Sequence, residues 1–251
     1  MAISEKSWAP RLAAGSRPPF GLVKGYGKIP RSNMSLKRFL ADHLVPYSGL
    51  LDRTNWTSKW CRTVEQADCP MFATREDLYR YLQKLLLRDA PIDYLEFGVA
   101  DGASLRSWCD INRHQGSRFW GFDCFTGLPE DWNEKRPKGT FSQNGIPPEI
   151  GDARVRFEVG LFQDTLPAFV NSYQPANSLV IHNDSDLYSS TLYTLTMLDR
   201  VCIPDSVVIF DEFSDALHEY RALIDYSGAY RRKFRVIAAT RRFDQAAVVL
   251  Y

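Results

Sequence analysis

The chain has 251 residues, with 31 lysines and arginines against 30 aspartates and glutamates, and a formal net charge of +1. A charge so close to zero creates no overall field that would attract nucleic acid or an anionic membrane, so we expect neither as a partner. Hydrophobic residues make up 45% and charged residues 24%, the balance of an ordinary globular protein. The chain contains no run of about 18 apolar residues, so we expect no membrane span. The N-terminus lacks the charged-then-apolar pattern of a signal peptide. The five cysteines form no C-x-x-C pair, which favours reduced thiols in a cytoplasmic protein.

Residues 1–73 differ in character from the rest of the chain. They are rich in aromatic residues, and their prolines and glycines break any long helix before residue 31. Helical spacing predicts a short helix over residues 35–44. We expect residues 1–73 to form a mostly helical or irregular cap on a domain that spans residues 74–251.

From residue 74 onward the pattern predicts alternating helices and strands. Thr74 is placed to cap a helix that ends before Pro91. Continuous apolar strands are typical of a sheet that is covered by helices on both faces. The order therefore predicts an α/β fold with a Rossmann-like sheet. The expected strands are 93–99, 117–123, 155–159, 178–182, 206–210, 234–238 and 246–250, with helices after the first, third, fourth and fifth.

The clearest motif lies between Tyr94 and Ser104. A short apolar strand is followed by Gly98 and Gly102, which form a Gly-x-x-x-Gly turn before a helix. Glycines are needed where a strand turns sharply into a helix and a ligand approaches the backbone closely. The dinucleotide fingerprint would need a glycine at Ala100, so a nicotinamide cofactor is disfavoured. Simple packing of a helix on a strand could also account for the two glycines.

Acidic side chains stand where successive strands end. In an open α/β sheet, ligands bind beyond the carboxyl ends of the strands, near the point where the strand order reverses. Asp123 ends one strand and is placed to accept hydrogen bonds from two ribose hydroxyls. Four more carboxylates would repel one another strongly without a cation, and carboxylate oxygens suit Mg²⁺. Capping of the helices that follow is the alternative explanation. These four are Asp184, Asp186, Asp211 and Glu212.

Five motifs follow one another along residues 74–251. They are Glu96-Phe-Gly-Val-x-x-Gly-x-Ser104, Gly121-Phe-Asp-x-Phe-x-Gly-Leu-Pro-Glu130, Gly160-x-Phe-x-x-Thr-Leu-Pro167, Asp184-x-Asp-Leu-Tyr-x-Ser-Thr191 and Ile209-Phe-Asp-Glu212. Together they resemble the macrocin O-methyltransferase family. Its members are class I enzymes that use S-adenosyl-L-methionine and Mg²⁺ to methylate sugar hydroxyls on natural products.

The resemblance implies a seven-stranded methyltransferase sheet and assigns roles to residues. Asp184, Asp211 and Glu212 match the metal ligands, and Asp186 matches the general base beside a catalytic Asp184. The family's usual Asp-Asp pair is Asp211-Glu212 here, which keeps an oxygen ligand on a longer arm. A homo-oligomer is expected from the resemblance alone. The expected cofactor-binding residues are Glu96, Gly98, Gly102, Ser104, Asp123, Gly160, Leu161 and Phe162.

We therefore expect an Mg²⁺-dependent O-methyltransferase that acts on a hydroxyl, preferably of a sugar, on a small-molecule natural product. Residues 125–152 are too many for a simple connection, and we expect them to enclose the acceptor together with Tyr47, Trp56 and Trp60. His182 points to the same side of its strand as Asp184, and we expect it to pack or support the site rather than catalyse. Two alternatives stay open. One is a metal-independent methyltransferase for another acceptor, and the other is a non-catalytic S-adenosylmethionine-binding module.

Overall fold

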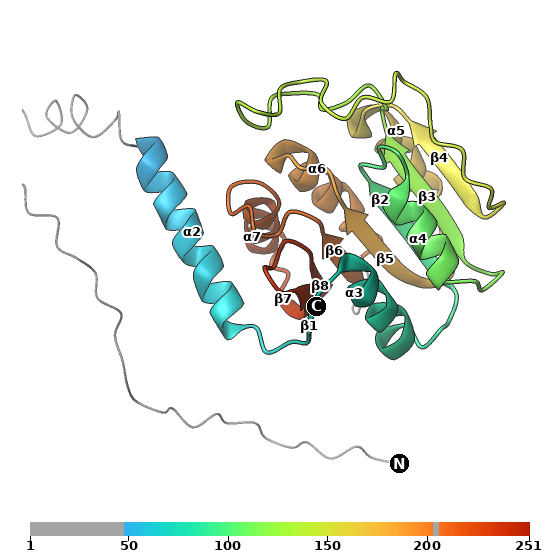
Figure 1. Ribbon diagram of the computed structural model, residues 1–251, viewed down its shortest axis with the longest axis horizontal. Coiled ribbons are helices and arrows are strands. Elements are labelled where there is room, and N and C mark those ends of the chain that lie inside the picture. The colour runs from blue at the N-terminus through green and yellow to red at the C-terminus, as the bar shows by residue number, and fades with distance from the viewer. Residues whose placement is uncertain (1–47, 203–205) are drawn as a thin grey trace, which may run out of the picture. The chain divides into compact units, whose positions relative to one another are not determined.

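The computed structural model describes residues 48–202 and 206–251 (Figure 1). They belong to one compact unit that runs from Pro46 to Tyr251. The helix predicted over residues 35–44 lies outside the described residues, as does Tyr47.

An eight-stranded sheet forms the centre of this unit, in the order β1-β7-β8-β6-β5-β2-β3-β4. Strand β8 runs antiparallel to both of its neighbours, and the other pairs are parallel. The predicted α/β fold is confirmed with all seven strands, and β1 is an eighth that pairs with β7. Two residues are too short a run to show any periodicity in a sequence. The strands are β1 Met71–Phe72, β2 Ile92–Phe97, β3 Arg118–Asp123, β4 Val155–Val159, β5 Ser178–Asn183, β6 Val207–Phe210, β7 Phe234–Thr240 and β8 Ala246–Leu250.

Helices cover both faces of the sheet and create two hydrophobic cores. On β2, Leu95 and Phe97 belong to the core beneath α5, α6 and α7, whereas Tyr94 faces the core beneath α3 and α4. No helix in the described part of the chain is long and apolar enough to cross a lipid bilayer. The helices are α2 Ser48–Gln66, α3 Arg75–Tyr81 with a π-helical continuation Leu82–Leu86, α4 Ala103–Ile111, α5 Phe162–Ser172, α6 Tyr188–Leu198 and α7 Glu219–Tyr230.

Helix α2 packs against α7. Trp56 is buried in the core, and the ring of Trp60 meets Phe243 edge-on. The hydroxyls of Thr63 and Tyr220 lie 2.8 Å apart. Residues 48–72 are thus part of the same unit as the sheet, whereas the sequence placed the boundary of a separate cap at residue 73.

The strand order reverses between β2 and β5. The chain moves outward from β2 through β3 to β4 on one side, and from β5 to β6 on the other. In the register of these two strands, Phe97 lies opposite Asn183, so both loops leave the sheet at the same level. A ligand site is expected at such a point, beyond the carboxyl ends of the strands.

Candidate active site

The glycine turn after β2 touches the loop after β5. Gly98 has a φ of 90°, and a Cβ atom built there would lie 1.8 Å from the carbonyl oxygen of Asp184. Gly102 has a φ of 81° and precedes the first residue of α4. Ala100, where a dinucleotide site would need glycine, also has a positive φ of 46°. The loops after β2 and β5 are therefore in direct backbone contact at the switch point, with no side chain between them.

Asp123 at the end of β3 secures this turn. Its Oδ2 accepts hydrogen bonds from the backbone N–H groups of Val99 and Ala100 at 2.8 and 2.9 Å, and its Oδ1 accepts one from Phe125 at 2.7 Å. A carboxylate offers about four acceptor positions, so backbone donors already use most of them. Asp123 also lines the cavity, but its oxygens hold the loop rather than standing free for the two ribose hydroxyls that the sequence suggested.

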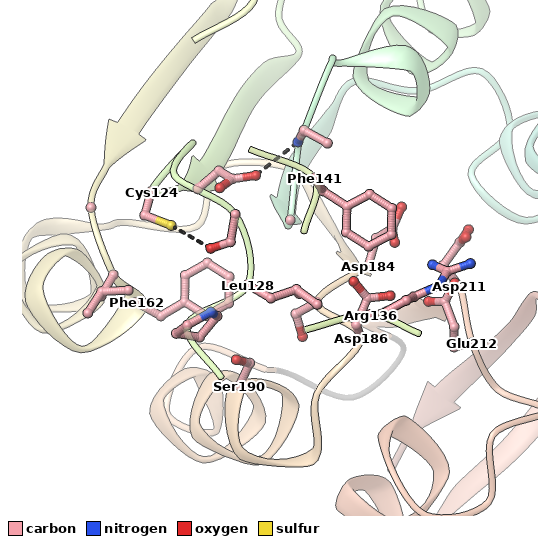
Figure 2. A pocket seen from close by; sticks show the side chains of 18 of the residues that line it. Cys124, Leu128, Arg136, Phe141, Phe162, Asp184, Asp186, Ser190, Asp211 and Glu212 are labelled. Carbon is pink, nitrogen blue, oxygen red and sulfur yellow. Dashed lines mark hydrogen bonds between the residues drawn. The ribbon is translucent and has the colours of Figure 1, made fainter. Parts of the chain in front are cut away.

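A cavity of about 380 Å³ opens at this edge of the sheet (Figure 2). This volume lies within the range of about 300–1,000 Å³ that is typical of small-molecule sites. Three residues expected to bind the cofactor, Glu96, Gly102 and Ser104, do not line it. The other five do: Gly98, Asp123, Gly160, Leu161 and Phe162.

The four predicted carboxylates all line this cavity, away from Cys124 and Phe162 in Figure 2. Asp184, Asp211 and His182 offer ligand atoms within 4.8 Å of one another, and so do Asp184, Asp186 and Glu212. The three residues expected to bind metal are thus divided between two groups that share Asp184. Within the described chain, Asp211 Oδ1 and Glu212 Oε2 are buried without a hydrogen-bond partner.

The crowding of these acids appears in their pKa values. Burial, together with the charge of Asp211, raises the pKa of Asp184 well above its usual value. Burial raises the pKa of Asp186 to about 7, although Arg136 opposes the shift. Burial and neighbouring acids raise the pKa of Glu212 to about 12. Like charges forced together out of water behave in this way, and a bound divalent cation would reverse the shifts.

The pKa of Asp211 shifts in the opposite direction, because basic side chains lie beside its carboxylate. Burial would raise the pKa of Asp211, but His182 and Arg75 outweigh it and hold the pKa below its usual value. The Arg75 guanidinium lies 3.1 Å from Asp211 Oδ2 and also lines the cavity. Sequence reasoning missed Arg75, because only the docking of α3 brings its first residue to the end of β6.

Glu219 is a second residue that sequence reasoning missed. It is fully buried at the start of α7, where its Oε2 accepts the backbone N–H of Glu212 at 2.9 Å. Its Oε1 accepts a hydrogen bond from the side-chain amide of Asn183 at 3.0 Å. An acidic residue in the first turn of a helix is common, so nothing in the sequence distinguishes this one.

The long connection over residues 125–152 forms one wall of the cavity, through Leu128, Pro129, Arg136 and Phe141. The guanidinium of Arg136 lies 4.7 Å from the ring centre of Trp132 and 5.1 Å from that of Phe141. The aromatic residues of α2 were expected to share this wall, and they do not. No described residue between 48 and 73 lines the cavity.

A model of the family described as Macrocin-O-methyltransferase (TylF) matches residues 71–250, from β1 to the last strand. The chain belongs to this family. It is 31% identical over 211 residues to 8-demethyl-8-(2,3-dimethoxy-alpha-L-rhamnosyl)-tetracenomycin-C 4'-O-methyltransferase of Streptomyces olivaceus, covering 70% of this chain and 78% of that protein. It is 28% identical over 177 residues to demethyldecarbamoylnovobiocin O-methyltransferase of Streptomyces niveus, covering 60% of this chain and 66% of that protein.

Solved structures share the fold of this macrocin O-methyltransferase family member. The O-methyltransferase NovP aligns with a TM-score of 0.55 and 23% identity, over 69% of this chain and 78% of NovP. The calicheamicin methyltransferase CalS11 aligns with a TM-score of 0.53 and 19% identity, over 90% of this chain and 98% of CalS11. Family membership identifies the chain as an S-adenosylmethionine-dependent O-methyltransferase.

Proposed function

We propose that this enzyme transfers the methyl group of S-adenosylmethionine to a sugar hydroxyl of a glycosylated natural product, assisted by Mg²⁺. The observation that carries the metal in this proposal is the group of four carboxylates beside the glycine turn, in which two buried oxygens lack a partner. The acceptor class is supported by the relatives, since the name of one describes a rhamnosyl tetracenomycin.

The residues at the ends of β5 and β6 fit Mg²⁺. This ion prefers oxygen ligands and is usually bound through one or two carboxylates and water. Five acids, Asp123 among them, line the cavity against two cations, Arg75 and Arg136, so a divalent cation would offset most of the excess negative charge. Asp184, Asp211 and Glu212 would hold the ion. When bound, it would lower the pKa of an acceptor hydroxyl and fix its direction.

The chain's own residues supply position and a proton acceptor. Gly98 and Gly160, which follow β2 and β4, both line the cavity where the cofactor would lie against the strand ends. The methyl group on the sulfonium is already activated, so the main task is to align the acceptor oxygen behind it. As the new O–CH₃ bond forms, the S–CH₃ bond breaks and S-adenosylhomocysteine leaves.

Asp186 is the base of this proposal. It lies in the cavity with a φ of 61°, in a tight turn closed by a 2.6 Å hydrogen bond from the backbone N–H of Leu187 to the carbonyl of Ser185. Such a backbone is uncommon outside glycine and is often found at functional sites. Asp186 would take the hydroxyl proton of the acceptor, a step typically worth about 10²–10⁴-fold in rate.

The test is methyl transfer from labelled S-adenosylmethionine to matched glycosides and aglycones, with EDTA and then with restored Mg²⁺. We expect transfer to glycosides, loss of activity in EDTA and recovery with Mg²⁺. An unchanged rate in EDTA would favour the metal-independent alternative, in which Arg75 is the counter-charge. Binding of S-adenosylhomocysteine, but not of NAD⁺, without transfer to any acceptor would favour a non-catalytic binding module.

A further inference from the structure

Four polar side chains, three on the neighbouring strands β2 and β5 and one just after β6, point to the same face of the sheet. Tyr94 and Glu96 are two residues apart on β2, and His182 of β5 lies directly opposite Glu96. On β6, Ile209 lies opposite His182, and Asp211 follows two residues later. Because side chains alternate with a period of two, all four lie beneath α3 and α4.

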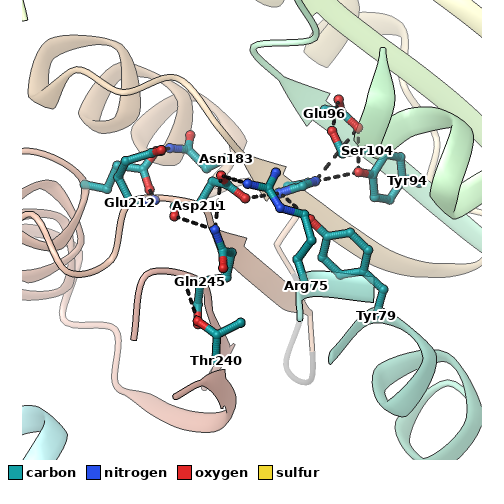
Figure 3. A network of polar contacts seen from close by, with 12 residues as sticks. Arg75, Tyr79, Tyr94, Glu96, Ser104, Asn183, Asp211, Glu212, Thr240 and Gln245 are labelled. Carbon is teal, nitrogen blue, oxygen red and sulfur yellow. Dashed lines mark hydrogen bonds and ion pairs between the residues drawn. The ribbon is translucent and has the colours of Figure 1, made fainter. Parts of the chain in front are cut away.

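Contacts inside the core join these side chains (Figure 3). The Tyr94 hydroxyl donates to Glu96 Oε2 at 2.6 Å and also lies 2.6 Å from Nδ1 of His182. A phenol has a single proton, and Tyr94 gives it to Glu96, so Nδ1 of His182 must donate to the Tyr94 oxygen. This contact fixes the orientation of the imidazole, and its other nitrogen, Nε2, faces Asp211.

Asp211 is the group that Nε2 of His182 meets. Nε2 lies 3.6 Å from Asp211 Oδ1 and 3.4 Å from the hydroxyl of Tyr79. The other carboxylate oxygen, Oδ2, is held by Arg75 at 3.1 Å and Gln245 at 3.4 Å. Oδ2 is therefore held by two side chains, whereas Oδ1 faces Nε2 of His182 without a hydrogen bond.

The other end of the network secures the helix after the glycine turn. Glu96 Oε1 accepts the hydroxyl of Ser104 in the first turn of α4 at 2.8 Å. Glu96, Tyr94 and His182 have no exposed surface at all. Burial of an acid is costly, and an apolar core of similar shape would often be at least as stable. Glu96 and Ser104, which do not line the cavity, instead fix Tyr94 and through it His182.

We infer that His182, fixed by Tyr94 and Glu96, is a positioning residue that holds Asp211 ready for a divalent cation. The inference rests on the proposed Mg²⁺ site. Partners behind a metal ligand commonly change metal affinity by about 10–100-fold when they are removed.

The sharpest variant is Tyr94→Phe, because Tyr94 contacts neither the cavity nor any of its carboxylates. The matched control is Tyr226→Phe, another fully buried tyrosine, whose hydroxyl donates to Asp199 at 2.8 Å in the opposite core. Binding of Mn²⁺ is measured by electron paramagnetic resonance on protein saturated with S-adenosylhomocysteine. Affinity for S-adenosylhomocysteine is measured separately by calorimetry.

We expect Tyr94→Phe to weaken Mn²⁺ binding about tenfold and to leave S-adenosylhomocysteine affinity within about twofold. Tyr226→Phe should change neither. His182→Gln, which can still donate to Tyr94 but offers no second nitrogen to Asp211, should lose at least as much Mn²⁺ affinity.

Wild-type Mn²⁺ affinity in folded Tyr94→Phe or His182→Gln would overturn the inference and leave the proposed Mg²⁺ site intact. Absence of Mn²⁺ binding by the wild-type protein would overturn the metal site and, with it, this inference. The two failures are thus distinguishable.

Discussion

The carboxylates at the ends of β2 and β3, the paired half of the sheet edge, differ in hydrogen bonding from those at the ends of β5 and β6. At the ends of β2 and β3, both oxygens of Glu96 and of Asp123 accept hydrogen bonds from the protein itself. At the ends of β5 and β6, Asp211 and Glu212 each keep a buried oxygen without one. Buried polar atoms are nearly always paired, so an unpaired one calls for an explanation. The acids of the first half bind groups of the protein itself, whereas those of the second half leave oxygens available for the proposed metal ion.

We expect the largest loss of activity from changes at the ends of β5 and β6, the unpaired half of the edge, where buried carboxylate oxygens lack a hydrogen bond. Asp211→Asn keeps the shape of the side chain but removes its charge, and we expect turnover to fall about 10³-fold, since a catalytic metal supplies several kcal/mol. Initial rates with saturating S-adenosylmethionine and Mg²⁺ measure the loss. Asp244→Asn, which alters a carboxylate that accepts from Ser214 outside the cavity, is the control. A rate for Asp211→Asn near that of the wild type would contradict the metal-assisted account.

Asp186→Asn distinguishes a base from a ligand within the unpaired half. We expect the rate to fall about 10²–10⁴-fold through loss of the proton acceptor. Mn²⁺ and S-adenosylhomocysteine should still bind as in the wild type. A parallel loss of Mn²⁺ affinity would instead place Asp186 among the metal ligands, beside Asp184 and Glu212.

Asp123→Asn tests the paired half. The amide keeps one accepting oxygen but turns a donor toward backbone N–H groups of the glycine turn, and hydrogen bonds to a charged group are worth about 1.5–3 kcal/mol. We expect S-adenosylhomocysteine affinity to fall roughly tenfold in calorimetry, with Mn²⁺ affinity unchanged. Loss of both in a folded variant would show that the two halves are not separate.

Arg136→Ala examines the wall over residues 125–152. The side chain stacks on Trp132 and Phe141 and lines the cavity beside the carboxylates. We expect the KM for the acceptor to rise several-fold, in line with a contact worth about 1 kcal/mol, while S-adenosylhomocysteine affinity stays constant. A change confined to the cofactor would place this wall over the cofactor rather than over the acceptor.

Asp93 extends the comparison to the far end of β2, where we expect no effect on catalysis. Burial alone would raise its pKa, but hydrogen bonds from Arg118, Tyr173 and the backbone of Ala176 lower the pKa below the usual value. The stability that this carboxylate contributes is therefore complete above its unfolded pKa of about 3.9. It is lost as the pH falls through the lower folded value.

Asp93→Asn should be less stable at neutral pH and should lose less stability on acidification than the wild type. Urea midpoints between pH 3 and pH 7 measure both effects. Parallel pH profiles for the two proteins would show that Asp93 titrates alike in the folded and unfolded states.

The sequence was informative where a residue's position follows from its own strand. Asp184, Asp186, Asp211 and Glu212 end apolar runs, so their meeting at one edge was predictable from parallel strands alone. Arg75 and Glu219 belong to helices, and their nearness to residues 211 and 212 depends on how α3 and α7 dock. Trp56 and Trp60 were wrongly placed because an aromatic residue in an amphipathic segment suits a core as well as a pocket wall.

Glu96 shows a further limit of motif reasoning. An acid two residues before a glycine turn suggests a cofactor contact, yet its strand register turns it into the core, where Tyr94 and Ser104 occupy its oxygens. Only the pairing of β2 with β5 brings His182 opposite and joins this acid to Asp211.

The most direct test of the account is calorimetric titration of metal-free protein with Mg²⁺ in the presence of S-adenosylhomocysteine, with wild-type protein and Asp211→Asn side by side. The account predicts one Mg²⁺ site per chain in the wild type and loss of that site in the variant. Folded wild-type protein that binds S-adenosylhomocysteine but no Mg²⁺, or equal Mg²⁺ binding by both proteins, would contradict it.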